Sequence, residues 1–299
     1  MDSANFHILM QLMLSGVIAG SIYGLIALGF VVIFKSTTVV NFAQGEIMMM
    51  GAYFCYYLVV THKIPFLPAF VMTLVFSALL GMLVEMLILR PMIGEPIFSI
   101  IMITVGLATL LRSIVGLIWG HDTLPFPSPF EDTTFELSGM VVSPAEAATV
   151  VSVAILFLAL FAFFKYTKLG LATRATAFDQ RWAFLMGISV RKIFSLAWAI
   201  ASVVAAVGGV LLGLVGGLEP NMSFIGLKVF PAVVLGGLES IVGAVVGGLL
   251  VGVSESLAGG YLSAWFGSGV KELSAFVVLL IVLMFRPYGL FGKKEIIRV

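Results

Sequence analysis

The sequence predicts an all-α, polytopic integral membrane protein, a helix bundle with about nine membrane passages, one of them short or broken. Of the 299 residues, 61% are hydrophobic and only 10% are charged, whereas soluble globular domains carry about 25% charged residues. The uncharged stretches are long, and the first runs unbroken from Ile8 to Phe34. A helix needs about 20 residues to cross the hydrocarbon core, whereas a barrel strand shows about ten residues of alternating polarity. These observations exclude an ordinary soluble enzyme, a disordered chain and a membrane β-barrel.

The nine predicted passages are 8–34, 37–60, 65–89, 97–118, 145–165, 193–217, 222–236, 239–260 and 270–287. Most of them reach the length that a spanning helix needs. The seventh is shorter and contains Lys228 and Pro231, so it is the short or broken one. The first is longer than the apolar core of a signal peptide and follows no Lys or Arg, so we expect it to be retained. No separate soluble domain is apparent, and we predict a single transmembrane domain over residues 1–299.

Basic residues set the expected orientation, because cytoplasmic loops carry an excess of Lys and Arg. Six lie within 165–192, and the C-terminal region carries Arg286, Lys293, Lys294 and Arg298. Both regions should be cytoplasmic, so the number of crossings between them is even and the short seventh segment must cross or re-enter. The N-terminus is then outside, the C-terminus and the 166–192 loop are inside, and the 119–144 loop is external. That loop is proline-rich, which predicts an extended surface loop, and its charged residues are all acidic: Asp122, Glu131, Asp132 and Glu136.

Several kinds of chemistry are excluded by what the sequence lacks. The net charge of +1 and the absence of a polybasic face argue against nucleic-acid binding. The single cysteine, Cys55, lies in an apolar run and cannot form a CxxC metal site. The motifs HExxH, GxSxG and GxxxxGKS/T are absent. We therefore expect no catalytic residue, no metal and no cofactor in this chain.

The segment from Asn41 to Glu46 places polar side chains in an otherwise apolar passage. Asn41, Gln44 and Glu46 accompany Gly45 there, and amide or ionisable groups inside a membrane usually face a cavity or a polar partner. One interpretation is an unwound helix that exposes backbone groups to a translocation path. The other is an ordinary cytoplasmic helix start, with Asn41 as the N-cap and Glu46 in the first turn. The residue pattern alone leaves both open.

A second break, at Gly236 and Gly237, ends the short seventh passage. Successive passages alternate in direction, so the second and the seventh run in opposite directions. In transporters, a pair of interrupted helices with opposite orientations points to a pathway at the membrane midplane. One hypothesis is that Gly236 and Gly237 lie on such a path, opposite the 41–46 segment. The alternative is a tight turn between two helices, in which glycine supplies the backbone freedom.

Three further ionisable residues, Glu85, Arg112 and Glu255, lie within predicted passages, and we expect structural roles for all three. Glu85 comes five residues before Arg90 and should extend its carboxylate to the inner interface. Arg112 comes late in its passage and should reach the outer headgroups. The glycines at 243, 247, 248 and 252 have the spacing of helix packing.

The 166–192 loop is too long for a plain connection between helices, and we predict a short cytoplasmic helix within 174–187. Phe178, Trp182 and Leu185 are spaced to share one face of it, opposite Asp179 and Gln180. Such a face suits docking into a groove of a partner protein. The alternative is an interfacial helix that lies on lipid headgroups, anchored by Trp182 and the basic residues.

Three long stretches, 24–53, 174–215 and 227–256, resemble the permeases of branched-chain amino-acid ABC importers, in the order expected for that family. The length fits the smaller, LivH-type permease of the pair. The resemblance implies a transport permease domain without catalysis of its own, in a bacterial or archaeal cell (inner) membrane, with hydrophobic amino acids such as Leu, Ile and Val as substrates. It also implies four partners: a second, related permease, two cytoplasmic ATPases that bind ATP and Mg²⁺, and an external substrate-binding protein.

The resemblance also assigns roles to the two motifs. It implies that Asn41 to Glu46 lie on a central, broken helix. It implies that a coupling element seats on an ATPase through Arg174, Ala175, Phe178, Asp179, Trp182, Leu185 and Gly187. Related permeases carry urea, short amides or other neutral amino acids, so these substrates stay open. The main alternative mechanism is an ion-coupled secondary transporter in which Glu46 or Glu239 binds the ion.

Overall fold

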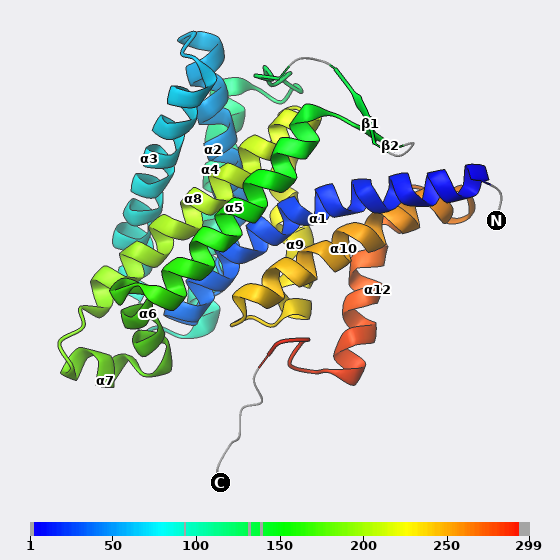
Figure 1. Ribbon diagram of the computed structural model, residues 1–299. Helices are drawn as coiled ribbons and strands as arrows, with labels where there is room; N and C mark the ends of the chain where they lie inside the picture. Colours follow the sequence, from blue (N-terminus) through cyan, green and yellow to red (C-terminus); the bar gives the residue numbers. More distant parts are fainter. Residues whose placement is uncertain (1–2, 93, 131–132, 138–139, 293–299) are drawn as a thin grey trace. The chain divides into compact units, whose positions relative to one another are not determined.

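The computed structural model describes residues 3–92, 94–130, 133–137 and 140–292, and they are mostly helical (Figure 1). The α-helices are α1 (Ser3–Thr37), α2 (Gln44–Tyr56), α3 (Phe66–Val84), α4 (Ile97–Trp119), α5 (Pro144–Tyr166), α6 (Lys168–Phe178), α7 (Gln180–Leu185), α8 (Val190–Gly216), α9 (Ile225–Gly236), α10 (Ile241–Tyr261), α11 (Ser263–Phe266) and α12 (Val270–Phe285). Two π-helical turns, η1 (Tyr57–Thr61) and η2 (Glu85–Leu89), and two 3-10 turns, η3 (Arg90–Met92) and η4 (Pro220–Phe224), adjoin them. The predicted all-α fold is confirmed.

Each of the nine predicted passages contains one of these helices. Six helices in the described part of the chain are long and apolar enough to cross a membrane, namely α1, α3 with its η extensions, α4, α5, α8 and α10. The helices in the other three passages, α2, α9 and α12, are shorter, and α9 contains Pro231. The chain is therefore a multi-pass membrane protein, and the count of nine passages stays a prediction.

The chain forms two compact units, and the first, here called the α2 unit, comprises Val32–Pro129 and Ala154–Leu227. In it, α2 lies against α3, α4 and α8, and α8 also runs along α3 (Figure 1). The helices approach closely where glycine removes the side chain, since a Cβ on Gly51 would overlap Ala206. Close approach of small residues is how helices associate in lipid. As a result, ten of the thirteen residues of α2 are buried, Cys55 among them.

The second, the α10 unit, comprises the chain up to Val31, Phe130–Val153 and the chain from Lys228 onward. Within it, the N-terminal part of α1 crosses α10 at two glycine contacts, Gly24 against Gly248 and Gly20 against Gly252. Neither contact has room for a Cβ. The prediction that the glycines of this passage serve helix packing is confirmed.

Next to that crossing, α1 and α10 also share a buried hydrogen bond. The hydroxyl of Tyr23 donates to the carboxylate of Glu255 across 2.7 Å, and Glu255 exposes 2% of its surface. The expected structural role of Glu255 is supported by this bond, because a polar group buried among apolar helices needs a partner.

The 119–144 loop contains a β-hairpin that the sequence reasoning did not predict. Strand β1 (Phe135–Leu137) pairs antiparallel with β2 (Met140–Val142). The sequence predicted an extended surface loop without naming these strands, and the apolar and β-branched residues after the prolines favour their pairing. Nearer the start of the loop, Leu124 forms a single antiparallel bridge with Leu218. Five of the charged residues used to predict orientation lie outside the described residues: Glu131, Asp132, Lys293, Lys294 and Arg298.

Candidate functional site

The chain between α1 and α2 is non-helical and forms the first part of the candidate site. Thr38 follows α1 with a φ of 58°, in the left-handed region that β-branched residues rarely adopt. Asn41 Oδ1 then accepts a hydrogen bond from the backbone nitrogen of Ala43 across 3.0 Å, and α2 begins at Gln44. The second passage therefore starts its helix at Gln44 and not at residue 37. The interpretation with Asn41 as N-cap is wrong, because Ala43 holds that position.

The polar residues predicted at this break are buried and bonded. Asn41 and Gln44 are fully buried, and Glu46 exposes 2% of its surface. Asn41 Nδ2 donates to Gln44 Oε1, and Gln44 Nε2 donates to the backbone oxygen of Ala201 in α8, each across 3.2 Å. An ordinary cytoplasmic helix start would leave such groups to water. Their burial within the unit favours the other interpretation, in which a helix breaks inside the protein.

Glu46 is paired with Arg112 of α4, a residue that we expected to reach the outer headgroups. The Arg112 guanidinium donates to the Glu46 carboxylate and lies over the ring of Phe224, 4.1 Å from its centroid. The side chain of Arg112 stays one-third exposed, whereas that of Glu46 is buried. The expectation for Arg112 was wrong because a charge inside a passage is least costly beside a counter-charge. The presence of both a Glu and an Arg inside predicted passages was the sequence signal that could have indicated their pairing.

Gly45 allows another segment of the α2 unit to pass directly beside this cluster. A Cβ on Gly45 would overlap the backbone oxygen of Ser223, and the backbone of Gly226 is also in contact with Gly45. The 220–226 segment therefore lies against the start of α2. This close approach accounts for the position of Phe224 over Arg112.

Gly236 and Gly237 lie at the end of α9, in the α10 unit. Gly237 has a φ of 97°, which glycine adopts readily. A Cβ on Gly236 would overlap the backbone oxygen of Gly243 in α10, and the Gly236 oxygen accepts a hydrogen bond from the nitrogen of Phe291 across 3.2 Å. These contacts have the geometry of the tight turn that was the alternative interpretation. A place for the two glycines on a translocation path stays a prediction.

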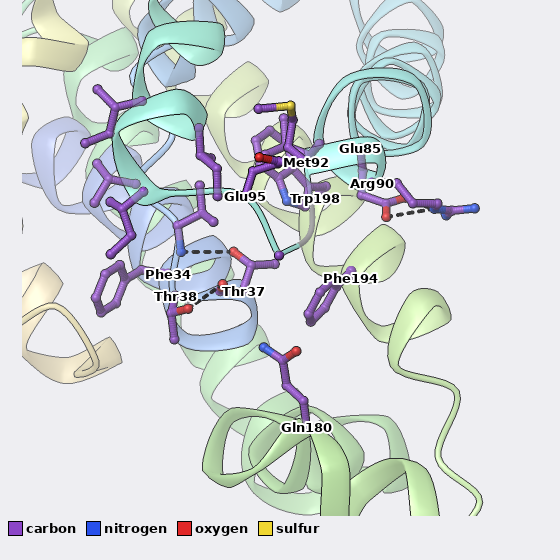
Figure 2. A pocket seen from close by; sticks show the side chains of 17 residues that line it. Phe34, Thr37, Thr38, Glu85, Arg90, Met92, Glu95, Gln180, Phe194 and Trp198 are labelled. Carbon is purple, nitrogen blue, oxygen red and sulfur yellow. Dashed lines mark hydrogen bonds and ion pairs between the residues drawn. The ribbon is translucent and has the colours of Figure 1, made fainter.

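A second buried carboxylate in the α2 unit, Glu85, lies at the start of η2 and exposes 1% of its surface. It accepts hydrogen bonds from the guanidinium of Arg90 across 2.7 Å and from Ser195 Oγ across 2.5 Å. The prediction that Glu85 extends to the interface was therefore wrong, because Arg90 and Ser195 satisfy it inside the unit. Figure 2 shows the Glu85–Arg90 pair at the wall of a cavity of about 440 Å³.

The predicted coupling segment is two helices rather than one. α6 ends at Phe178, and Asp179 has an extended backbone. The Asp179 carboxylate accepts hydrogen bonds from the backbone nitrogens of Arg181 and Trp182, at 2.7 and 3.0 Å, and so caps α7. The prediction of one helix with a shared apolar face was wrong, because aspartate stabilises a helix start better than a helix interior.

The apolar side chains of this segment are nevertheless exposed. Phe178, Trp182 and Leu185 expose 91%, 67% and 71% of their surfaces. Arg174 is also exposed, Ala175 is half-buried, and Gly187 turns the chain after α7 with a φ of 82°. An exposed apolar surface of this kind marks a contact with a protein or a membrane.

Metal chemistry finds no support in the described part of the chain. Within those residues, no group of three or more His, Cys, Asp or Glu side chains is placed to hold a metal ion. The buried polar groups at the start of α2 are instead an amide pair and an ion pair. Such groups can orient a polar solute or steady a helix break, and neither task requires a cofactor.

Known proteins that are similar to this chain identify its family. Residues 12–285 match the family described as "Branched-chain amino acid transport system / permease component". The chain belongs to this permease family. Among its relatives are the high-affinity branched-chain amino acid transport system permease proteins LivH of Salmonella typhimurium and Escherichia coli, 31% and 32% identical over 99% of this chain and all of theirs. The corresponding protein BraD of Pseudomonas aeruginosa is 32% identical over 98% of this chain and 99% of its own.

A solved structure supports the fold of this permease. The chain is similar to one in the structure of PsaBC from Streptococcus pneumoniae in complex with Fab, with a TM-score of 0.51 and 16% sequence identity. The similarity covers 94% of this permease and 92% of that chain. At this identity it bears on the helical architecture alone.

Proposed function

We propose that this permease is the membrane subunit of an ATP-binding-cassette importer for branched-chain amino acids. The observation that carries the proposal is the similarity, along nearly the whole chain, to permeases named for high-affinity branched-chain amino acid transport. The six apolar helices suit the membrane part of such an importer. The sequence has no phosphate-binding GxxxxGKS/T motif, so hydrolysis of ATP, with its Mg²⁺, belongs to partner ATPases and this subunit has no catalytic role.

The translocation path in this proposal runs beside the start of α2, at Asn41, Gln44, Gly45 and Glu46. Support comes from the burial of these residues at the start of the central helix of the unit, and from the non-helical chain that leads into it and includes Asn41. A path for a hydrophobic amino acid needs mostly apolar walls with few polar groups, because tight binding would slow release. Arg112 joins this set because it pairs with Glu46 and stays partly exposed. Gly236 and Gly237 are assigned to the same path by the opposed directions of the second and seventh passages.

The partners follow from the same assignment. A second, related permease completes the membrane part, two ATPases dock on the cytoplasmic side, and an external binding protein delivers the amino acid. The exposed apolar side chains around Asp179 form the ATPase contact, with Arg174, Ala175 and Gly187 at its borders. Large aromatic side chains such as Trp182 often dominate protein contacts.

Orientation is assigned from the basic residues of the 166–192 loop and of the C-terminal region. The C-terminus and the coupling segment are cytoplasmic, and the N-terminus and the 119–144 loop are external. That loop, with its hairpin, then faces the binding protein.

Uptake of radiolabelled leucine by membrane vesicles that contain the assembled importer tests the function. Uptake is expected to require ATP and the binding protein, and to persist when ionophores collapse the ion gradients. Unlabelled isoleucine and valine should compete, whereas urea and acetamide should not. Uptake that needs an ion gradient and no ATP would establish the secondary-transporter alternative instead.

A further inference from the structure

The α2 unit contains a cavity whose volume, about 440 Å³, lies in the range of small-molecule sites. Its walls come from the end of α1, the 38–40 segment, η2, η3, the start of α4 and α8, with Gln180 at the first position of α7 (Figure 2). Most wall residues are apolar, among them Phe34, Ile101 and Phe194. The polar cluster formed by Asn41, Gln44, Glu46 and Arg112 is not part of the wall.

The backbone departs from regular helix at two places in this wall. Glu85 and Leu89 are the first and last residues of the π-helical turn η2, and π-helical turns occur frequently at functional sites. Thr38, on the facing segment, holds its left-handed φ of 58°, a conformation that costs energy and collects at ligand sites and switch regions. Two independent irregularities thus meet at one cavity.

Charge is buried in the same wall. Glu85 is paired with Arg90 and Ser195 at 2.7 and 2.5 Å. Glu95, also in the wall, is exposed and has no ion pair within the described residues. The wall therefore carries one more negative than positive side chain, which favours a ligand with a cationic group.

The wall also holds a hydrogen-bond donor without a partner. Trp198 is fully buried, and its indole Nε1 has no hydrogen-bond partner among the described residues. A buried indole N–H usually has one. Trp198 is among the residues around the cavity. A movement of the ring that opens this N–H to the cavity would let a ligand acceptor, such as a carboxylate oxygen, satisfy it.

We propose that this cavity is a second binding site, separate from the path at α2, for a small zwitterion with an apolar body. Its ligand is an amino acid with an aliphatic side chain: the ammonium group faces Glu95, the carboxylate accepts from Trp198, and the side chain lies among Phe34, Ile101 and Phe194. Gln180 begins α7, so the occupant contacts the segment assigned above to ATPase coupling. This position suits a site that senses amino acid on the side of the ATPases.

Isothermal titration of L-leucine into the full-length permease, purified in detergent without any binding protein, tests the proposal. Saturable binding with a Kd of about 1 mM or tighter is expected. Ile101→Trp fills the cavity and should abolish binding, whereas Met102→Trp, an exposed neighbour outside the wall, should not. Trp198→Phe removes the indole N–H together with part of the ring, keeps an aromatic side chain at this position, and should weaken binding about fivefold to tenfold. No saturable binding to the wild-type chain, or undiminished binding to Ile101→Trp and Trp198→Phe, would overturn the proposal.

Two further arms identify the ligand chemistry and the place where it binds. Isoamylamine and 4-methylpentanoate each lack one charge of leucine and should bind at least tenfold more weakly. Glu46→Gln alters the path at α2, so it should lower uptake and leave leucine binding at the cavity unchanged. Equal binding of decanoate, unaffected by Trp198→Phe, would mean a lipid pocket, and loss of binding in Glu46→Gln would place leucine on the path. Either result contradicts the proposal, and neither depends on ATP-driven uptake.

Discussion

At the scale of single residues, the three carboxylates that are buried inside the passages each have a partner within their own unit. Glu46 pairs with Arg112 and Glu85 with Arg90 in the α2 unit, and Glu255 accepts from Tyr23 in the α10 unit. A buried charge is costly, and removing one member of a pair costs more than replacing both. Because of this asymmetry, single and double variants of Glu46 and Arg112 can be compared to show what the pair does.

Glu46→Gln and Arg112→Gln should each lower the unfolding free energy by about 2 kcal/mol, because each leaves a charged hydrogen-bonding group without its partner. The double variant should recover most of that stability. Uptake should fall at least tenfold in both single variants and stay low in the double variant, because the pair serves the path. Thermal unfolding and leucine uptake, measured on all three, give the two readouts.

The exposed pair between Lys228 and Glu272, with 2.5 Å between its charged atoms, provides the control. Glu272→Gln should change stability by less than about 1 kcal/mol, since the Glu272 side chain is 62% exposed in the first turn of α12 and exposed pairs contribute little. Recovery of uptake together with stability in the double variant of Glu46 and Arg112 would show that the pair is structural and not part of the path.

At the scale of the elements, the functional assignments fall where helices stop. α2 starts inside the α2 unit after a non-helical segment, and its first turn is uncapped by any side chain. The coupling segment breaks at Asp179, whose carboxylate caps α7. A broken helix exposes backbone groups that a continuous helix would satisfy. The break before α2 is accompanied by polar side chains, and the break at Asp179 by exposed apolar side chains.

The close approach at Gly45 predicts a sharp response to one methyl group. Gly45→Ala places a Cβ against the backbone oxygen of Ser223, and backbone cannot move aside as a side chain can. We expect a loss of monodisperse protein on size-exclusion chromatography and a lower midpoint of thermal unfolding. Gly106→Ala, on α4 with open space around it, should be neutral or slightly stabilising. Equal behaviour of the two variants would contradict the packing described for α2.

The coupling segment predicts a specific loss of ATPase binding. Trp182→Ala removes an exposed aromatic side chain that would contribute about 2 kcal/mol or more as an interface anchor. The ATPases should co-purify poorly with this variant, while the second permease is retained. Trp265→Ala, at a tryptophan on α11 that is more exposed than Trp182 (84% against 67%), should keep its ATPases. If Trp182→Ala retained them and coupled hydrolysis to uptake normally, the side chain would be a membrane anchor.

The elements that could be predicted from sequence are those set by long apolar runs. Every predicted passage contains a helix, because burial in lipid demands one wherever about 20 apolar residues occur. The hairpin at 135–142 and the break at Asp179 were missed. Each depends on which hydrogen-bond partner a few backbone groups take, and apolar runs do not determine that choice. The pairing of Glu46 with Arg112 was missed because it joins residues 66 positions apart, and no local pattern encodes which distant charge will meet which.

At the scale of the whole molecule, the proposed function depends on how the chain is oriented in the membrane. In the proposed orientation, which follows the positive-inside rule, the coupling segment lies on the side of the ATPases and the 119–144 loop on the side of the binding protein. Both placements must hold together, since import needs a donor on one side and an energy source on the other.

Cysteine labelling in whole cells tests that orientation. With buried Cys55 replaced by alanine, Ser128→Cys should react with a membrane-impermeant maleimide, because residue 128 is exposed in the predicted external loop. Met186→Cys, 81% exposed in the coupling segment, should react only after the membrane is opened. The reverse pattern would invert the orientation and remove the coupling segment from the ATPases.

The central claim is that this permease links ATP hydrolysis to the passage of a branched-chain amino acid. Its most direct test is the ATPase rate of the complete importer in proteoliposomes, with binding protein added empty or loaded with leucine. We predict that loaded binding protein raises the rate severalfold over empty protein, and that Trp182→Ala abolishes the increase. A rate that is the same with and without leucine, in an assembly that retains both ATPases, would contradict the claim.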